Sequence, residues 1–297
     1  MIQVAELLHQ EDLDVLPRGD SRLLGAQLAL YVLDQEVAYD YSGPIADVRQ
    51  RLMIVPRPRH GDQSRVAHRL DVAADTAMPD GVRQQVDRFG NAVVHVAADR
   101  VNESLQFGLR AVLRRDLTTE PVHDWPDPRP QLTRLTTPDA AIRKAAAGLR
   151  GGRDIGDVGD LADRVCALVR HEFTYRFGVT GVRTTAADAW AGRIGVCQDF
   201  AHVMIAICAC LHVPARYVSG HLVGDGASHA WVEVCDPRRG EVISLDPTHD
   251  RRTDLRYVVT AVGRDYSDVA PTTGTYVSKG GRGSLRVKKR IRLAHVA

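Results

Sequence analysis

The chain has 297 residues, of which 44% are hydrophobic and 26% charged, a composition typical of a globular protein. Its 39 basic and 37 acidic residues give a formal net charge of +2, which provides no electrostatic argument for binding nucleic acid. No apolar stretch approaches the roughly 20 residues of a membrane span, and the acidic N-terminus does not resemble a secretory signal. We therefore expect neither a membrane nor a nucleic-acid partner, and the length suits two domains.

The cysteines indicate reduced thiols. There are five, an odd number, and none belongs to a CxxC pair. Cys208 and Cys210 lie two residues apart in a helical pattern, so their side chains diverge too far to bridge readily. Unpaired thiols are typical of a cytoplasmic protein, which is the location that the sequence predicts.

The first part of the chain is predicted to be mostly β-structure. Runs rich in Val, Leu and aromatic residues alternate with turn residues over residues 28–40, 48–55, 65–72, 82–86, 92–97 and 105–113. Gly90 and Asn91, after Asp87, form a hairpin signal because both tolerate positive φ. Strands at this spacing predict an antiparallel β-sandwich over residues 1–117. No catalytic residue types gather there.

A proline-rich segment follows the predicted sandwich. Residues 118–138 contain five of the fourteen prolines, which remove backbone donors and block helices, so an extended linker is expected. Helical spacing of apolar residues then covers residues 139–149 and 157–172. Residues 139–297 are assigned to a catalytic domain. Within it, residues 286–292 (RVKKRIR) alternate with period two and are interpreted as an edge or surface strand rather than a polyanion-binding patch.

Cys197 occupies the most informative position. It follows Gly195 and begins a helix whose apolar residues recur at offsets 0, 4, 7, 8 and 11 from Phe200, the pattern of a buried helix. Free N–H groups and the dipole at a helix N-terminus favour a thiolate and can bind an oxyanion. The alternative is that Cys197 is a small buried hydrophobe, as expected for the other four cysteines.

His229 and Asp246 favour the reactive interpretation of Cys197. His229 lies on a predicted strand over residues 228–234, and Asp246 ends the next predicted strand, over residues 241–245. If these strands pair, the carboxylate can orient the imidazole while its other nitrogen faces the thiol, as a thiol nucleophile requires. A zinc site built from His221, His229, His249 and Asp246 is the competing interpretation, but no pair has the spacing of a common zinc motif.

Four blocks carry a resemblance to a known family. These are TAADAWAGRIGVC (185–197), QDFAHVMIAICACLHVPARYVSG (198–220), SHAWVEV (228–234) and LDPT (245–248). In this order, with gaps of 32 residues from Cys197 to His229 and 17 from His229 to Asp246, they resemble the transglutaminase-like superfamily. They are similar in particular to its bacterial cysteine-protease branch. GRDYSDVAP (263–271) and, in the first part of the chain, Pro56, Gln63 and Asn91 also resemble that branch, so the resemblance covers about residues 26–297.

The resemblance implies an α+β fold with a papain-like, transglutaminase-like catalytic domain and a Cys197–His229–Asp246 triad. It implies Tyr175 as a candidate second oxyanion donor, with a core aromatic as the alternative. Trp190 and Trp231 are candidate walls of the acyl site, or packing residues. His221 stands where the family pattern has an aromatic residue. The resemblance therefore does not predict the details of the substrate groove.

The expected function is hydrolysis of amide or peptide bonds through a thioester on Cys197, with a peptide or protein substrate. No calcium loop of the DxDxDG type is present, so neither a metal nor a cofactor is expected. Two alternatives stay open. One is a protein-glutamine transglutaminase or deamidase, and the other is a non-catalytic binding protein on the same fold. The polar residues between positions 220 and 228 favour water over an amine as the acyl acceptor.

Overall fold

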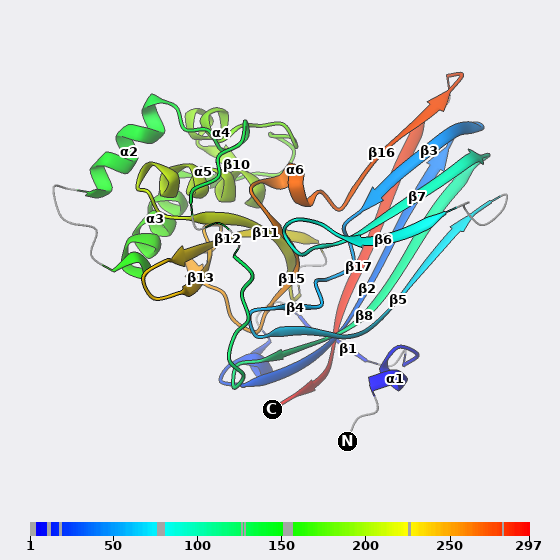
Figure 1. The fold of residues 1–297 in the computed structure, drawn as a ribbon, viewed down its shortest axis with the longest axis horizontal. Coiled ribbons are helices and arrows are strands. Elements are labelled where there is room, and N and C mark those ends of the chain that lie inside the picture. Colours follow the sequence, from blue (N-terminus) through cyan, green and yellow to red (C-terminus); the bar gives the residue numbers. More distant parts are fainter. Residues whose placement is uncertain are drawn as a thin grey trace.

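The computed structural model describes residues 4–10, 13–17, 20–75, 81–125, 127, 129–150, 157–224, 227–280 and 282–297. An antiparallel β-sandwich and a separate α+β layer structure lie side by side along the long axis of the molecule (Figure 1). This confirms the predicted α+β class with an N-terminal sheet domain.

The sandwich consists of two sheets. The first has, in order across it, β1 (Asp14–Val15), β17 (Gly283–Val296), β2 (Leu28–Tyr41), β8 (Ser104–Asp116), β5 (Gln63–Ala74) and β4 (Arg59–His60). The second has β16 (Thr272–Ser278), β3 (Ile45–Leu52), β7 (Ala92–Val101) and β6 (Val82–Val86). The strands alternate in burial, so that Leu33 of β2, Val48 of β3 and Phe107 of β8 enter one shared apolar core.

The last two strands return to the sandwich. β16 pairs with β3, and β17 pairs with β2 from Gly283 opposite Tyr41 to Val296 opposite Ala29. The sequence assigned all of residues 139–297 to the catalytic domain, whereas residues 272–296 complete the N-terminal sheets. Local patterning shows that a segment is a strand but not which distant strand it joins. The basic run 286–292 lies in β17, and β1 covers the outer edge of β17 only at Arg292 and Leu293.

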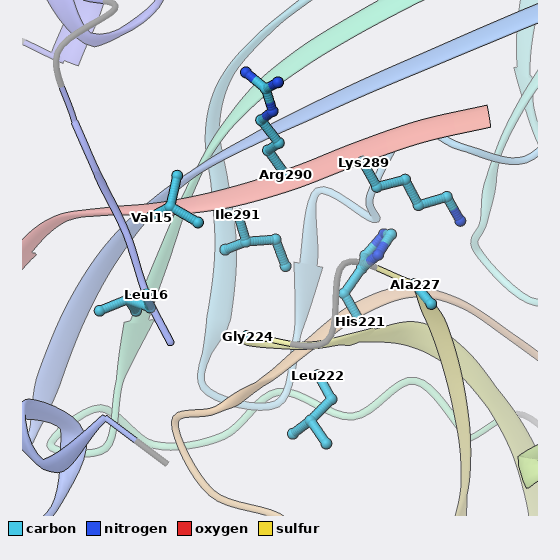
Figure 2. Close-up of a pocket in the computed structure, with 9 residues that line it drawn as sticks. All are labelled: Val15, Leu16, His221, Leu222, Gly224, Ala227, Lys289, Arg290 and Ile291. Carbon is cyan, nitrogen blue, oxygen red and sulfur yellow. The ribbon is translucent and has the colours of Figure 1, made fainter. Parts of the chain in front are cut away.

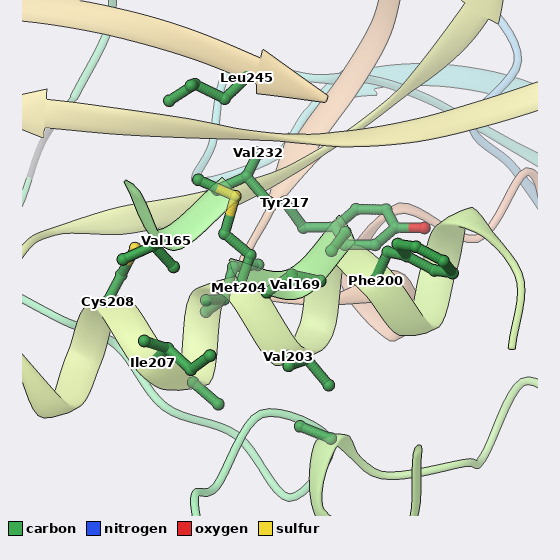
Figure 3. Close-up of a cluster of buried hydrophobic side chains, with 14 of the residues drawn as sticks. Val165, Val169, Phe200, Val203, Met204, Ile207, Cys208, Tyr217, Val232 and Leu245 are labelled. Carbon is green, nitrogen blue, oxygen red and sulfur yellow. The ribbon is translucent and has the colours of Figure 1, made fainter. Parts of the chain in front are cut away.

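The second part is a five-stranded antiparallel sheet covered by helices. Its strands, in order, are β14 (Arg251–Arg252), β13 (Glu241–Asp246), β12 (Ser228–Asp236), β11 (Ala215–Leu222) and β15 (Tyr257–Gly263). The principal helices are α2 (Ala140–Arg150), α3 (Val158–Glu172), α4 (Ala186–Gly192) and α5 (Cys197–Cys210). They gather on one face of the sheet (Figure 1), and α5 is buried between the sheet and the other helices (Figure 3).

The smaller elements complete the chain. They are α1 (Val4–Leu7), η1 (Ser21–Leu23), α6 (Tyr266–Val269) and the short parallel pair of β9 (Thr174–Tyr175) with β10 (Ile194–Gly195). Among the described residues from 118 to 138, no helix or multi-residue strand forms, and only Val122 makes a bridge, to Gly61.

Side-chain amides join the two parts. Gln63 of the sandwich bonds the backbone N–H and C=O of Val259, at 2.8 and 2.7 Å. Asn91 does the same for Val262, at 2.9 and 2.7 Å. Both targets lie on β15, the edge strand of the five-stranded sheet, so the two amides pair backbone groups that no neighbouring strand of that sheet reaches. The position of β15 is therefore fixed by residues more than a hundred positions away in the sequence.

Candidate active site

Cys197 begins α5, as its sequence context predicts. Val196 precedes the helix in an extended conformation, and its N–H donates to the Asp199 carboxylate at 2.8 Å. Thr180 Oγ1 donates to the same oxygen at 2.6 Å. A Cβ on Gly195 would lie 2.5 Å from that carboxylate, so only glycine allows this close approach. The result is a partly exposed thiol at the first turn of a buried helix.

His229 connects this thiol to Asp246. Its Nε2 lies 2.7 Å from Asp246 Oδ2, and its ring is close enough to Cys197 for the thiol to raise the pKa of the imidazole. Because Nε2 faces the carboxylate, Nδ1 is the nitrogen left for the thiol. β12 and β13 pair antiparallel, with Val232 opposite Leu245. This pairing places the start of β12, which carries His229, next to the end of β13, which carries Asp246. The structure thus brings together all three residues that the sequence singled out.

Asp246 accepts more hydrogen bonds than the sequence indicated. Its Oδ2 receives Tyr257 Oη and lies against His249 Nδ1, each at 2.7 Å, in addition to His229. Its Oδ1 accepts from the Thr248 backbone N–H at 2.9 Å. The carboxylate is fully buried, and burial alone would raise its pKa. The hydrogen bonds from His229, His249 and Tyr257 outweigh burial and hold the pKa of Asp246 well below its usual range.

His229 is correspondingly basic. Burial alone would lower its pKa, but the hydrogen bonds with Asp246 and Cys197 raise the pKa of His229 to about 10. The imidazole is therefore protonated at neutral pH. An imidazolium donates from both nitrogens, which matches the carboxylate on one side and a sulfur acceptor on the other.

Trp231 supports the imidazole from the side. The two rings are stacked with centroids 6.2 Å apart, and Trp231 Nε1 donates to Ser244 Oγ at 3.0 Å. A Cβ on Gly220 would lie 2.5 Å from the indole, so the ring packs directly on the backbone of β11. Trp231 is only 1% exposed. This placement favours packing behind His229 over a wall of the acyl site.

Trp190 and Tyr175 occupy different environments. Trp190 is buried in the helical core, 6.0 Å from the ring of Phe173, and the Arg193 guanidinium covers its face at 3.5 Å. Tyr175 is 52% exposed and pairs with Gly195 in the short parallel bridge, next to the residues that present Cys197. Of the two, Tyr175 is the exposed one, and its strand lies beside the segment that leads into Cys197.

His221, where the sequence departs from the family pattern, lies away from the triad. It is buried in β11 and borders a cavity of about 180 Å³ between the catalytic sheet and β17 (Figure 2). Burial holds the pKa of His221 well below its ordinary value, so it is neutral. Among the described residues that line this cavity, none belongs to the triad; they are Val15, Leu16, His221, Leu222, Gly224, Ala227, Lys289, Arg290 and Ile291.

Two groups of side chains have the residue types of a metal site. One is His229, Asp246 and His249, in which the ring nitrogens already face the carboxylate. His221, which completed the zinc alternative in sequence, is not part of it. The other is His60, His123 and Glu233, where the sandwich and linker meet β12. There Glu233 lies 2.6 Å from His60 Nε2 and 2.8 Å from the Arg216 guanidinium. Because the Arg216 guanidinium already binds the Glu233 carboxylate, its positive charge disfavours a metal cation at this group.

Comparison with known proteins agrees with this architecture. The profile of the Transglutaminase-like superfamily matches residues 145–247, and that of the Bacterial transglutaminase-like N-terminal region matches residues 31–114. An uncharacterised protein of Mycobacterium tuberculosis is 31% identical over 281 residues, which cover 82% of this chain and 86% of that protein. An uncharacterised protein of Mycobacterium leprae is 40% identical over 121 residues, covering 37% and 42%. The chain belongs to the transglutaminase-like superfamily.

A solved structure shares the whole fold. It is a protein of Cytophaga hutchinsonii, named only as a candidate cysteine protease, with a TM-score of 0.66 and 22% sequence identity. The match covers 90% of this chain and 98% of that one, so both the sandwich and the catalytic layers are shared. Within the described residues, no helix is both long enough and apolar enough to cross a membrane.

Proposed function

We propose that this protein is a cysteine hydrolase that cleaves amide or peptide bonds through a thioester on Cys197. Membership of the transglutaminase-like superfamily supports a cysteine-dependent enzyme. The observation that carries the finer proposal is the position of His229, whose Nε2 lies 2.7 Å from Asp246 Oδ2 and whose ring neighbours Cys197. A nucleophile, a base and a group that orients the base form the arrangement that covalent catalysis by a thiol requires.

In the acylation step, the Cys197 thiolate attacks the carbonyl carbon of the scissile amide. The negative charge that develops on the carbonyl oxygen is stabilised by backbone N–H groups at the N-terminus of α5. His229, as an imidazolium, transfers its Nδ1 proton to the leaving nitrogen, and the C–N bond breaks. The products are a thioester on Cys197, a released amine and a neutral His229.

In the deacylation step, water completes the turnover. Neutral His229 takes a proton from a water molecule, whose oxygen adds to the thioester carbonyl. The C–S bond then breaks, which releases the acid and restores the thiolate–imidazolium pair. Asp246 keeps its charge throughout and holds His229 in one orientation. Tyr175 is proposed as a second donor to the oxyanion, because its strand pairs with Gly195, two residues before the nucleophile.

Solvent access supports water as the usual acyl acceptor. Cys197 is partly exposed, as are Tyr175, which pairs with Gly195, and the side chain of His249 beside Asp246, at 52% and 35%. An enzyme that transfers acyl groups to amines must keep water from the thioester. Residues 220–222, which the sequence placed in a polar loop that favours water, belong to β11 and are buried.

A peptide or protein is the proposed substrate, and every step above uses only groups of this chain. A cytoplasmic location is part of the proposal and is supported by the five free thiols.

The test is a peptide-cleavage assay with purified protein and mass spectrometry of the acyl-enzyme. Cleavage that is abolished by Cys197→Ala but retained by Cys210→Ala, together with a trapped acyl group on Cys197, is expected. A fluorescent primary amine, added without calcium, reports transfer. Amine incorporation that outruns hydrolysis would establish the transglutaminase alternative. A protein that binds peptides but forms no acyl-enzyme would be the non-catalytic alternative.

A further inference from the structure

A loop of residues 176–183 lies against the segment that presents Cys197. At its start, the Arg176 N–H donates to Gly195 O at 2.9 Å, directly after the pairing of Tyr175 with Gly195. Near its end, Thr180 Oγ1 donates to Asp199 at 2.6 Å, and Gln198 Nε2 donates to Gly181 O at 3.3 Å. The loop is thus tied on both sides of the nucleophile, to residues two before it and one and two after it.

This loop exposes apolar side chains instead of burying them. Phe177 is 87% exposed, Val182 56% and Val179 45%. Three large apolar side chains within six residues, held at a candidate active site, are more than the scattered exposure that is normal for a protein surface. Their anchors are polar and backbone groups, so the apolar side chains are not needed to hold the loop in place. Exposed apolar surface of this kind marks a binding site.

The same loop carries unbalanced positive charge. Arg176 and Arg183 are both exposed, and no acidic residue occurs from position 173 to 187. The acids that flank this stretch are engaged elsewhere: Glu172 pairs with Arg193 at 3.2 Å, and Asp188 accepts from Thr185 in a capping box. A ligand with a negative charge beside an apolar group would complement the loop.

We propose that residues 176–183 form a substrate-recognition surface that selects extended peptide segments with a large apolar side chain next to an acidic residue. This inference rests on the proposed function and deepens it, because it names the class of peptide that reaches Cys197. Phe177 supplies apolar contact area, and Arg176 and Arg183 supply the charge that fixes the register of the peptide.

The test measures binding to the Cys197→Ala protein, so that it does not depend on turnover. Three fluorescein-labelled peptides of twelve residues share a Gly-Ser-Gln background. The first has a central Leu-Phe flanked by Asp, the second has Lys in place of the Asp residues, and the third has Ser in place of Leu-Phe. We expect the first to bind about tenfold more tightly than the third, since burying an aromatic side chain contributes on that order. We expect the second to bind at least about threefold more weakly than the first.

Two loop variants in the Cys197→Ala background assign the preference. Phe177→Ser should remove the difference between the first and third peptides, and Arg176→Glu should remove the difference between the first and second. Leu285→Ser and Arg290→Glu, at exposed positions of β17, are the matched controls and should leave both preferences unchanged. Equal binding of the three peptides, no measurable binding of any, or a preference that survives both loop variants would overturn the inference.

Hydrolysis is measured separately with proteins that keep Cys197, both the unmodified enzyme and the loop variants. If the loop variants lose peptide selectivity but the unmodified enzyme forms no acyl-enzyme, the recognition surface stands and the hydrolase proposal fails. If an acyl-enzyme forms equally well with all three peptides, and the three also bind with equal affinity, the hydrolase proposal stands and the recognition surface fails.

Discussion

His249 Nδ1 lies 2.7 Å from Asp246 Oδ2, the same oxygen that His229 Nε2 approaches to 2.7 Å. One carboxylate oxygen therefore serves two imidazoles, one deep in the site and one that is 35% exposed. Since an ionised carboxylate only accepts, both rings donate to it. The basicity of His229 depends on the negative charge of Asp246. A pH titration of activity can test this dependence.

The fall of kcat/KM at high pH, its alkaline limb, should follow the deprotonation of His229. Its pKa is raised to about 10, so the imidazolium that protonates the leaving amine is present below that pH and is lost as the pH rises through it. Asp246→Asn removes the charge that stabilises the imidazolium. We expect the limb of kcat/KM to move at least one unit to lower pH, and the rate at neutral pH to fall about 10³-fold or more. Asp250→Asn, an exposed neighbour, is the control and should keep both values.

Removal of His249 should not move the alkaline limb of kcat/KM to lower pH, in contrast to Asp246→Asn. His249→Ala deletes one of the donors that share Asp246 Oδ2, which leaves more of the carboxylate charge for His229. We expect a loss in kcat/KM within about tenfold, from looser positioning, and an alkaline limb that stays in place or moves up. A limb that moves down, as in Asp246→Asn, would show instead that His249 stabilises the imidazolium itself.

Limiting iodoacetamide at neutral pH should alkylate Cys197 before the other four cysteines. Burial raises the pKa of Cys208 to about 12, and it also raises the pKa of Cys166, Cys210 and Cys235. Among the five cysteines, Cys197 alone combines a helix N-terminus with the neighbouring imidazole of His229. Peptide mapping by mass spectrometry identifies the modified thiol. Earlier modification of Cys210 or Cys235 contradicts the prediction, and His229→Ala should reduce the rate at Cys197 only.

Much of this site could be predicted because its key signals are local. The residues before Cys197 and around His229 and Asp246 form compact blocks with a fixed order and spacing. Tyr257 was missed because it belongs to a different strand, and only strand pairing brings its hydroxyl to Asp246. The sequence named His249 only as a ligand of the alternative zinc site, since its distance of three residues from Asp246 fits a turn contact as well as a surface position.

The fold was predictable in its elements more than in its connections. Most strand and helix segments agree closely, as for β6 at Val82–Val86, whereas β3 begins and ends three residues earlier than the predicted 48–55. The return of β17 to β2 was not foreseen, because it pairs segments about 250 residues apart, for which local periodicity carries no signal. The same holds for Glu233. Its place on an alternating strand was evident, but its partners His60 and Arg216 come from other elements.

Glu233→Gln should weaken the joint between the two parts of the molecule. Glu233 is 2% exposed, lies 2.6 Å from His60 Nε2 and accepts from Arg216 Nε at 2.8 Å. Removing the charge leaves a buried guanidinium uncompensated, which costs about 3–5 kcal/mol. Urea unfolding should show this loss. Asp71→Asn, which breaks an exposed pair with Arg69, should cost at most about 1 kcal/mol.

The same cluster should make stability fall in acid. Burial, only partly offset by Glu233, lowers the pKa of His60, so its contribution is present above an unfolded pKa of about 6.5 and is lost as the pH falls below it. Burial would raise the pKa of Glu233, but His60 and Arg216 lower it below the ordinary 4.5, so its contribution is lost at still lower pH. Glu233→Gln should therefore show a shallower decline below pH 4.5 than the unchanged protein.

Truncation should show that the catalytic layers do not fold alone. A fragment of residues 118–297 lacks Gln63 and Asn91, which pair the outer edge of β15, and lacks β2 and β3, to which β17 and β16 bond. It also uncovers Val258, which packs in the apolar core of the sandwich. An unpaired edge beside exposed apolar surface promotes association. We expect this fragment, and equally residues 1–271, to aggregate in size-exclusion chromatography and to lose the selective alkylation of Cys197. A monomeric 118–297 fragment with Cys197 still the first thiol to react would show instead that the sandwich is dispensable for the site.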